Sequence, residues 1–267
     1  MADAFDLDRL GGLRGLDALV DTVLGAGELA LAMQRDVLRG EGIARKADAS
    51  PVTVADQAVE ARIRAHVEAR HPGAGWLGEE TGAAGEGAAL RFVVDPIDGT
   101  RAFLRGLPTW SVLVAVEAAG VPSVGIAFLP AAGDLYVGVR GSGARVNGRP
   151  CRLSSVAALG EALVCHGALA QFTEARRESA LGALARGSYT QRGLADFAGY
   201  GALLRGQADA VVDPGVEPYD VAAAAVLVRE AGGRATDLRG RETVHGDGFV
   251  ASNGLLHDAL LGLIDAA

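Results

Sequence analysis

A buried strand that runs directly into two aspartates constrains this chain more than any other feature. Residues 92–94 (FVV) read as an apolar strand, and residues 95–100 (DPIDGT) follow without a spacer. Pro96 fixes its own φ and keeps Asp95 out of the helical region, so we expect the strand to stop there and the chain to bend until Asp95 and Asp98 converge. Open α/β sheets bind ligands at the carboxyl ends of their strands, so the segment predicts a site.

The donor atoms around this bend favour a hard cation. We expect the carbonyl of Ile97 to face the same point as the two aspartates, and Mg²⁺ prefers this mixture of carboxylate and carbonyl oxygens. Glu79 and Glu80 form a second acidic pair upstream. Adjacent carboxylates are costly to bury unless a cation compensates them; the alternative is a solvated loop end. Gly99 and Thr100 open a short helical stretch whose free amides can bind a phosphate.

Two further aspartates lie in the first turns of predicted helices. Asp220 follows Pro218, which suits the first helical position, and Asp56 follows Thr53, a plausible N-cap. A carboxylate at either place can simply complement the helix dipole. The alternative is a functional role, which for Asp56 would be to orient a water molecule.

The charge balance excludes whole classes of partner. The 267 residues carry a net charge of −8, which argues against binding nucleic acid or an anionic membrane. The first residues lack the pattern of a signal peptide, and no apolar stretch is long enough to span a bilayer. Cys151 and Cys165 lack metal-site spacing, so we expect a reduced, cytoplasmic protein; the alternative is a single disulfide between the two cysteines. Lys46 is the only lysine among 25 basic residues, either by chance or because a compact ammonium is needed there.

The order of predicted elements changes character midway through the chain. The first half predicts two long helices, at 14–39 and from Thr53 to Arg70, followed by a meander of antiparallel strands. The second half alternates helices and strands, which is typical of an α/β unit. We therefore divide the chain into halves at 1–152 and 153–267. The meander strands are 110–117, 123–129 and 134–139; the second half comprises helix 173–185, strand 188–191, helix 195–206, strand 210–212, helix 218–231, strands 234–237 and 249–251, and helix 254–266.

Three segments together resemble the inositol monophosphatase family of Mg²⁺-dependent phosphomonoesterases. They are WLGEETG (76–82), FVVDPIDGTRAFLRGLP (92–108) and EPYDVAAAAVLVREAGG (217–233), and the resemblance covers nearly the whole chain. It implies an α/β fold, an αβαβα layered sandwich of two fused halves with the catalytic cleft between them. It also implies a homodimer and a small phosphate monoester as substrate.

The resemblance assigns a role to each acidic candidate. Glu79, Asp95 and the Ile97 carbonyl resemble the ligands of a first metal, and Asp95, Asp98 and Asp220 resemble those of a second. A third, weaker Mg²⁺ would depend on Glu79 and water. The site would therefore hold two to three Mg²⁺ ions, with Mn²⁺ able to substitute and Li⁺ expected to inhibit. Metal ions would also explain how an acidic protein binds an anionic ester.

The remaining site residues follow from the same resemblance. Asp56 and Thr100, together with Glu79, match the residues that orient the attacking water, and no covalent phospho-enzyme is needed. Asp98, Gly99 and Thr100 match the residues that hold the phosphate. Neighbours of the third metal or of the phosphate would be Lys46 and Glu80, with Arg45 as an equally placed alternative to the lysine.

The choice of alcohol depends on the second half. Four stretches resemble the histidinol-phosphate phosphatase branch: ADFAGY (195–200), RGLPTW (105–110), VREAGG (228–233) and SNGLLHD (252–258). We expect Asp196, Asp213 and Glu217 to face the leaving group, since a carboxylate favours the ammonium and imidazole of histidinol over a neutral polyol. The alternative is that Asp196 only caps the helix that follows.

The sequence therefore predicts a histidinol-phosphatase that converts L-histidinol phosphate to L-histidinol in histidine biosynthesis. Within the same family, an inositol-1-monophosphatase or a broad sugar-phosphate phosphatase is the alternative. A hypothesis of a different class is a family member that binds ligands without turnover.

Overall fold

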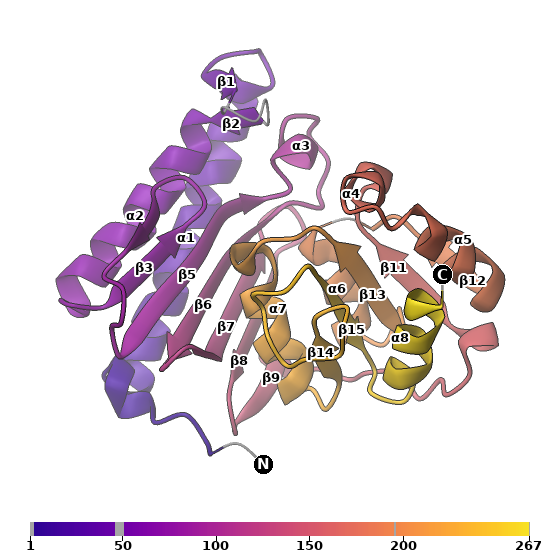
Figure 1. Cartoon of the computed structure of the whole chain (residues 1–267). Helices are drawn as coiled ribbons and strands as arrows, with labels where there is room; N and C mark the ends of the chain where they lie inside the picture. Colours follow the sequence, from indigo (N-terminus) through magenta and orange to yellow (C-terminus); the bar gives the residue numbers. More distant parts are fainter. Residues whose placement is uncertain (1–2, 46–50, 195, 267) are drawn as a thin grey trace.

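The computed structural model describes residues 3–45, 51–194 and 196–266 (Figure 1). Its helices are α1 (Gly12–Val37), α2 (Val54–Arg70), α3 (Thr100–Phe103), α4 (Leu169–Glu174), α5 (Glu178–Gly187), α6 (Phe197–Leu204), α7 (Pro218–Glu230) and α8 (His257–Asp265), with 3₁₀ turns at Leu7–Leu10 and Leu159–Glu161.

Two larger sheets and a short hairpin contain the strands. The eight-stranded sheet has the order β10-β9-β8-β7-β6-β5-β3-β4, and the five-stranded sheet has the order β12-β11-β13-β15-β14. The strands of the first sheet are β3 (Gly75–Gly78), β4 (Gly82–Ala84), β5 (Leu90–Asp98), β6 (Ser111–Ala118), β7 (Val121–Leu129), β8 (Asp134–Val139), β9 (Gly143–Val146) and β10 (Arg149–Pro150). Those of the second are β11 (Leu163–His166), β12 (Thr190–Arg192), β13 (Ala210–Pro214), β14 (Arg234–Thr236) and β15 (Gly248–Ser252), and the hairpin pairs β1 (Ile43–Arg45) with β2 (Pro51–Thr53).

Helices and sheets alternate as five layers (Figure 1). Helices α1 and α2 cover the outer face of the eight-stranded sheet, and α6 and α7 pack between the two sheets. Helices α4, α5 and α8 cover the outer face of the five-stranded sheet. This confirms the predicted αβαβα sandwich of the α/β class.

Helix α7 explains why the two sheets form one body. Its residues 221–228 are all buried, as expected of a helix that is apolar on every side. Although it comes from the second half of the chain, it packs against β5 to β9 of the first sheet, and both sheets contribute side chains to one shared core. The division into 1–152 and 153–267 stays a prediction.

The strand before the two aspartates is longer than predicted. β5 continues through Pro96 to Asp98, with a register shift against β6 between Asp95 and Asp98. Proline has no N–H to donate to a ladder, so the strand bulges at this point instead of stopping. The bulge keeps both aspartates at the carboxyl end of the strand.

Other predicted elements also needed correction. The helix expected at 173–185 is two helices, α4 and α5, separated at Arg176, whose φ of 55° is not helical. Strand β11 and the β1–β2 hairpin were not predicted. β11 has only four residues and lies between β12 and β13, so its pairing, which the local sequence does not show, defines it.

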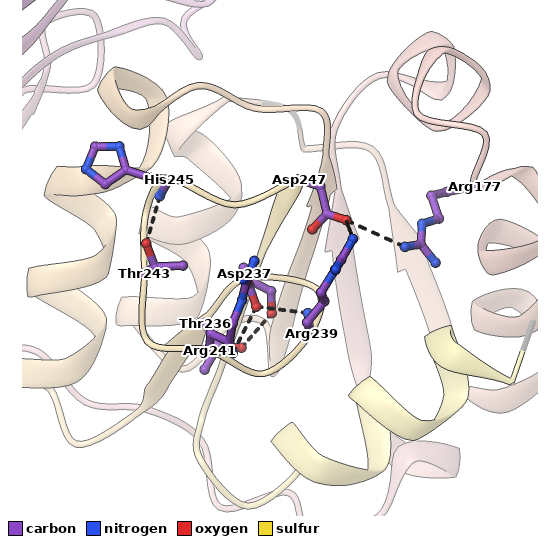
Figure 2. Close-up of polar contacts among 8 residues, drawn as sticks. All are labelled: Arg177, Thr236, Asp237, Arg239, Arg241, Thr243, His245 and Asp247. Carbon is purple, nitrogen blue, oxygen red and sulfur yellow. Dashed lines mark hydrogen bonds and ion pairs between the residues drawn. The ribbon is translucent and has the colours of Figure 1, made fainter.

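A buried aspartate organises the loop between β14 and β15 (Figure 2). Asp237 accepts hydrogen bonds from the backbone N–H groups of Arg239 and Arg241, both at 2.9 Å, and from the Arg241 side chain at 2.6 Å. Arg239 also pairs with Asp247, which lies 3.8 Å from Arg177 at the start of α5. These contacts tie the loop to the outer helices.

The structure bears on the expectations of reduced cysteines and of a chain without a membrane span. Cys151 and Cys165 are buried free thiols, and burial raises the pKa of Cys165 to about 12, so this thiol is unreactive. Over the described ranges, no helix has the length and apolar character needed to cross a bilayer.

Candidate active site

A cavity of about 470 Å³ lies where the carboxyl ends of β5 and β13 approach the start of α7. Its described lining residues include six carboxylates and one guanidinium, that of Arg101. The carboxylates are Glu79, Asp95, Asp98, Asp196, Asp213 and Asp220. A pocket with this imbalance needs positive charge from elsewhere.

Asp95 lies at the centre of the acidic group. Its side chain is 2% exposed, and its Oδ1 accepts a hydrogen bond of 3.1 Å from the backbone N–H of Ile97, which also lines the pocket. Burial raises the pKa of Asp95 well above its usual value, and the charges of Glu79, Asp98 and Asp220 raise it further. The four carboxylates therefore repel one another across the cavity.

Asp98 connects the first sheet to the central helices. The hydroxyl of Ser111 on β6 and the backbone N–H of Phe197 on α6 both donate to its Oδ2 at 2.7 Å. Burial raises the pKa of Asp98, Asp196 adds to the shift, and the two hydrogen bonds oppose it. The two hydrogen bonds thus fix the orientation of the Asp98 carboxylate, and neither of them comes from a cationic side chain.

Asp220 enters the cavity from the first turn of α7. Its Oδ2 accepts a 2.7 Å hydrogen bond from the backbone N–H of Glu217, and Pro218 occupies the first turn as predicted. Burial raises the pKa of Asp220, and Glu79 adds to the shift. The Glu217 side chain is exposed and outside the pocket lining, so the structure does not bring it to the predicted leaving-group position.

The donor set fits a hard divalent cation in its chemistry. Buried carboxylates with raised pKa values, beside the Ile97 residue whose carbonyl adds a neutral oxygen, are the oxygen ligands that Mg²⁺ prefers. In the ranges that the structure covers, no three His, Cys, Asp or Glu side chains are arranged so that they could hold a metal ion as they stand. The residues are gathered in one cavity, and a cation among them would remove their mutual repulsion.

Asp56 reaches the pocket through Thr100. It is fully buried at the start of α2, where its Oδ2 accepts hydrogen bonds from the backbone N–H and the hydroxyl of Thr53 at 2.7 and 2.6 Å. The Thr100 hydroxyl lies 3.3 Å from Asp56 Oδ1 and 3.2 Å from the Ile97 carbonyl oxygen. Burial raises the pKa of Asp56. The structure therefore brings the predicted pair together, 44 residues apart in sequence.

Asp213 lines the cavity and has a buried carboxylate. Its side chain is 4% exposed, and the hydroxyl of Tyr200 donates to Oδ2 at 2.6 Å. Oδ1 has no hydrogen-bond partner among the described residues. Burial raises the pKa of Asp213 to about 6. A Cβ at Gly167 would lie 2.9 Å from Oδ1, so this oxygen is packed against the Gly167 backbone.

Asp196 does not act as a helix cap. It precedes α6, but its side chain makes no capping hydrogen bond, which contradicts the capping alternative. Its backbone lies at φ 60°, ψ −161°, a region that is almost restricted to glycine. The carboxylate lies over Gly99, where a Cβ atom would sit 2.6 Å from Asp196 Oδ2. The conformation of Gly99, at φ 86°, thus requires glycine, and a Cβ there would also displace the Asp196 side chain.

The remaining predicted residues lie elsewhere. Lys46 is outside the described residues, and Arg45 is exposed on β1. Glu80 is outside the pocket lining, and its backbone N–H donates to Glu60 at 2.8 Å. The sequence analysis did not single out Glu60 and Ser111, which hold site segments in place. A glutamate on the apolar face of the second helix was a signal that could have revealed Glu60.

Fold and pocket together define an enzyme of the αβαβα class with an acidic active site. The chain belongs to the inositol monophosphatase family, whose model matches residues 15–267. It is a phosphoric monoester hydrolase, and members of this family are metal-dependent phosphatases.

Individual relatives carry two kinds of name. A histidinol-phosphatase of Mycobacterium tuberculosis is 42% identical over 227 residues, which cover 83% of this chain and 87% of the relative. An inositol-1-monophosphatase of Mesorhizobium japonicum is 31% identical over 255 residues, covering 92% and 94%. Among solved structures, the extragenic suppressor protein SuhB of Bartonella henselae matches with a TM-score of 0.86 and 27% identity, over 93% of this chain and 97% of that one.

Proposed function

We propose that this phosphatase hydrolyses L-histidinol phosphate to L-histidinol, as a step of histidine biosynthesis. The observation that carries the proposal is the buried carboxylate of Asp213, a residue that lines the cavity and whose Oδ1 has no hydrogen-bond partner in the described structure. Asp196, which is not used as a cap, lines the same cavity. The 42% identical relative named histidinol-phosphatase supports the same substrate.

Charge is the reason to favour this alcohol. Histidinol carries an ammonium and an imidazole, and both can donate charge-assisted hydrogen bonds to carboxylates. A neutral polyol would leave the charges of Asp196 and of the buried Asp213 uncompensated, which is costly. The cavity volume of about 470 Å³ lies in the range of small-molecule sites.

We further propose that two to three Mg²⁺ ions complete the site, with Mn²⁺ able to substitute and Li⁺ inhibitory. The ligands would be Glu79, Asp95, the Ile97 carbonyl, Asp98 and Asp220. When bound, the cations would supply Lewis-acid stabilisation of charge on the phosphoryl group and activation of water.

The protein itself would orient the reactants. The Thr100 hydroxyl would donate its proton in a hydrogen bond to Asp56 Oδ1. Its oxygen would then be free to accept a hydrogen bond from the attacking water and orient it. The backbone amides of Gly99 and Thr100 would hold phosphate oxygens, because they lie at the start of α3, where amides have no partner within the helix. Asp213 and Asp196 would hold the amine end of the alcohol.

The test is a panel of phosphate esters assayed with Mg²⁺. We expect kcat/KM for L-histidinol phosphate to exceed that for myo-inositol 1-phosphate and for hexose phosphates by at least about tenfold, since a charge-assisted hydrogen bond contributes about 1.5–3 kcal/mol. Asp213→Asn should reduce this preference without removing activity on the polyol ester. A larger kcat/KM for myo-inositol 1-phosphate would overturn the substrate proposal.

The second candidate is an inositol-1-monophosphatase or a broad sugar-phosphate phosphatase. The relative of that name, which is similar over 92% of this chain, favours it. A member that binds ligands without turnover would release no phosphate from any ester of the panel. A homodimer and a cytoplasmic location stay predictions, and light scattering after gel filtration tests the first.

A further inference from the structure

The turn that follows Glu79 is held by a buried glutamate of another element. Glu60 lies on α2 with 0% exposure. Its Oε2 accepts a 2.8 Å hydrogen bond from the backbone N–H of Glu80, and its Oε1 accepts one of 2.9 Å from the backbone N–H of Thr81. The Thr81 hydroxyl also donates to Oε1. One carboxylate therefore binds three donors of the turn.

Glu79 is fixed on its other side by the sheet. β3 and β5 pair in parallel, and the backbone N–H of Glu79 continues this pairing with a 3.2 Å hydrogen bond to the Val94 carbonyl. The backbone of Glu79 is thus held by β5 before the turn and by Glu60 after it.

Further contacts hold the Glu60 carboxylate itself in place. The Thr81 hydroxyl accepts hydrogen bonds from Trp76 Nε1 at 3.0 Å and Arg64 Nη1 at 3.1 Å, and the Arg64 guanidinium lies 5.6 Å from the centre of the Trp76 ring. A Cβ at Gly78 would lie 2.5 Å from Glu60 Oε1. The carboxylate is therefore packed directly against the end of β3.

Helix α2 carries both buried carboxylates that support the cavity. Asp56 and Glu60 are four residues apart on its buried face, one beside Thr100 and the other behind Glu79. We propose that Glu60 is a positioning residue for Glu79 and thereby sets the affinity of the cavity for divalent cations. The inference rests on the proposed function, in which Glu79 is a cation ligand.

The experiment measures Mn²⁺ binding to the full chain without substrate, from the electron paramagnetic resonance signal of free Mn²⁺. Glutamine at position 60 has a single acceptor oxygen and cannot serve both amides, so Glu60→Gln should weaken Mn²⁺ binding by about 10–100-fold, the usual effect of removing a partner behind a ligand. Glu28→Gln, at an exposed position of α1, is the matched control and should bind like the wild type.

A second pair of variants keeps the test decisive if Glu60→Gln does not fold. Thr81→Val removes the hydroxyl and should weaken Mn²⁺ binding, whereas Thr81→Ser keeps it and should restore wild-type affinity. If Glu60→Gln folds and binds Mn²⁺ with wild-type affinity, the inference is overturned but the proposed function is not. If Glu60→Gln does not fold, wild-type Mn²⁺ affinity of Thr81→Val has the same meaning. A wild-type chain that binds no Mn²⁺ would contradict the proposed function, and the inference with it.

Discussion

At the scale of single residues, a substitution at Asp98 can test catalysis without disturbing the fold. Both of its hydrogen bonds, from Ser111 and Phe197, end on the same oxygen. The carbonyl oxygen of an asparagine could accept both, so Asp98→Asn should keep the local structure and lose only a charge. We expect phosphate release to fall by at least about 100-fold. The melting temperature without metal should be unchanged or higher, because one repelling charge is removed. Phosphate release near the wild-type rate would contradict the role of Asp98.

The strained backbone of Asp196 lowers the stability of the protein, whereas we expect its carboxylate to favour one substrate. Its backbone conformation costs about 1–3 kcal/mol for a residue with a side chain. Asp196→Gly relieves this cost, and the added freedom of the unfolded chain offsets about 0.5–1 kcal/mol. Urea denaturation should therefore show a free energy of unfolding about 1 kcal/mol higher. The preference for L-histidinol phosphate over myo-inositol 1-phosphate should fall about tenfold or more.

A control isolates the charge of Asp196 from its backbone. Asp196→Asn keeps the strained conformation and removes only the charge, so it should lose the substrate preference without gaining stability. If Asp196→Gly were less stable than the wild type, the backbone of Asp196 would not be strained. If its substrate preference were unchanged, the Asp196 carboxylate would not contribute to that preference.

At the scale of elements, α7, which carries Asp220 in its first turn, packs closely against β7. A Cβ at Gly125 on β7 would meet the Ala223 carbonyl oxygen at 2.5 Å, so the strand accepts the helix only because this residue is glycine. Gly125→Ala should lower the free energy of unfolding by about 1–3 kcal/mol, the usual cost of overpacking. Gly160→Ala is the control, because the site has no neighbour within 4 Å. Equal stabilities of the two variants in urea would contradict this packing.

The start of α8 is sensitive to pH through a buried histidine. The hydroxyls of Thr236 and Ser252 lie 2.8 and 3.0 Å from the two ring nitrogens of His257. Burial lowers the pKa of His257 to about 4. The neutral ring is therefore favoured in the folded state, and its stabilisation is present above about pH 6.5 and is lost as the pH falls toward 4.

The corresponding measurement is urea denaturation of the wild type and His257→Gln between pH 4 and 7. The difference between them should shrink by up to about 3 kcal/mol as the pH falls. A difference that does not change with pH would mean that His257 is not held in its neutral form.

At the scale of the whole molecule, the acidic segments could be predicted because their signals are local, whereas the five layers and the meeting of these segments were implied by the family resemblance. Residues 92–100 combine an apolar strand with two aspartates, and the first turn of α7 carries Asp220, so each segment could be interpreted by itself. Strand β11 could not, because its four residues are defined by their neighbours in the sheet. The contact of Glu60 with a turn 20 residues away depends on how α2 packs.

The two sheets also explain why the pocket exists at all. Glu79, Asp95 and Asp98 come from the first sheet, and Asp220 comes from the helix that packs between the sheets. Side chains gathered in this way raise one another's pKa values, and the account requires that cations compensate them in the working enzyme.

The most direct test is a crystal soaked in Mn²⁺ and measured by anomalous diffraction. We expect at least two Mn²⁺ peaks within the cavity, bounded by Glu79, Asp95, Asp98, Asp220 and the Ile97 carbonyl. A map with no anomalous peak among these oxygens, or with peaks only at the surface, would contradict it.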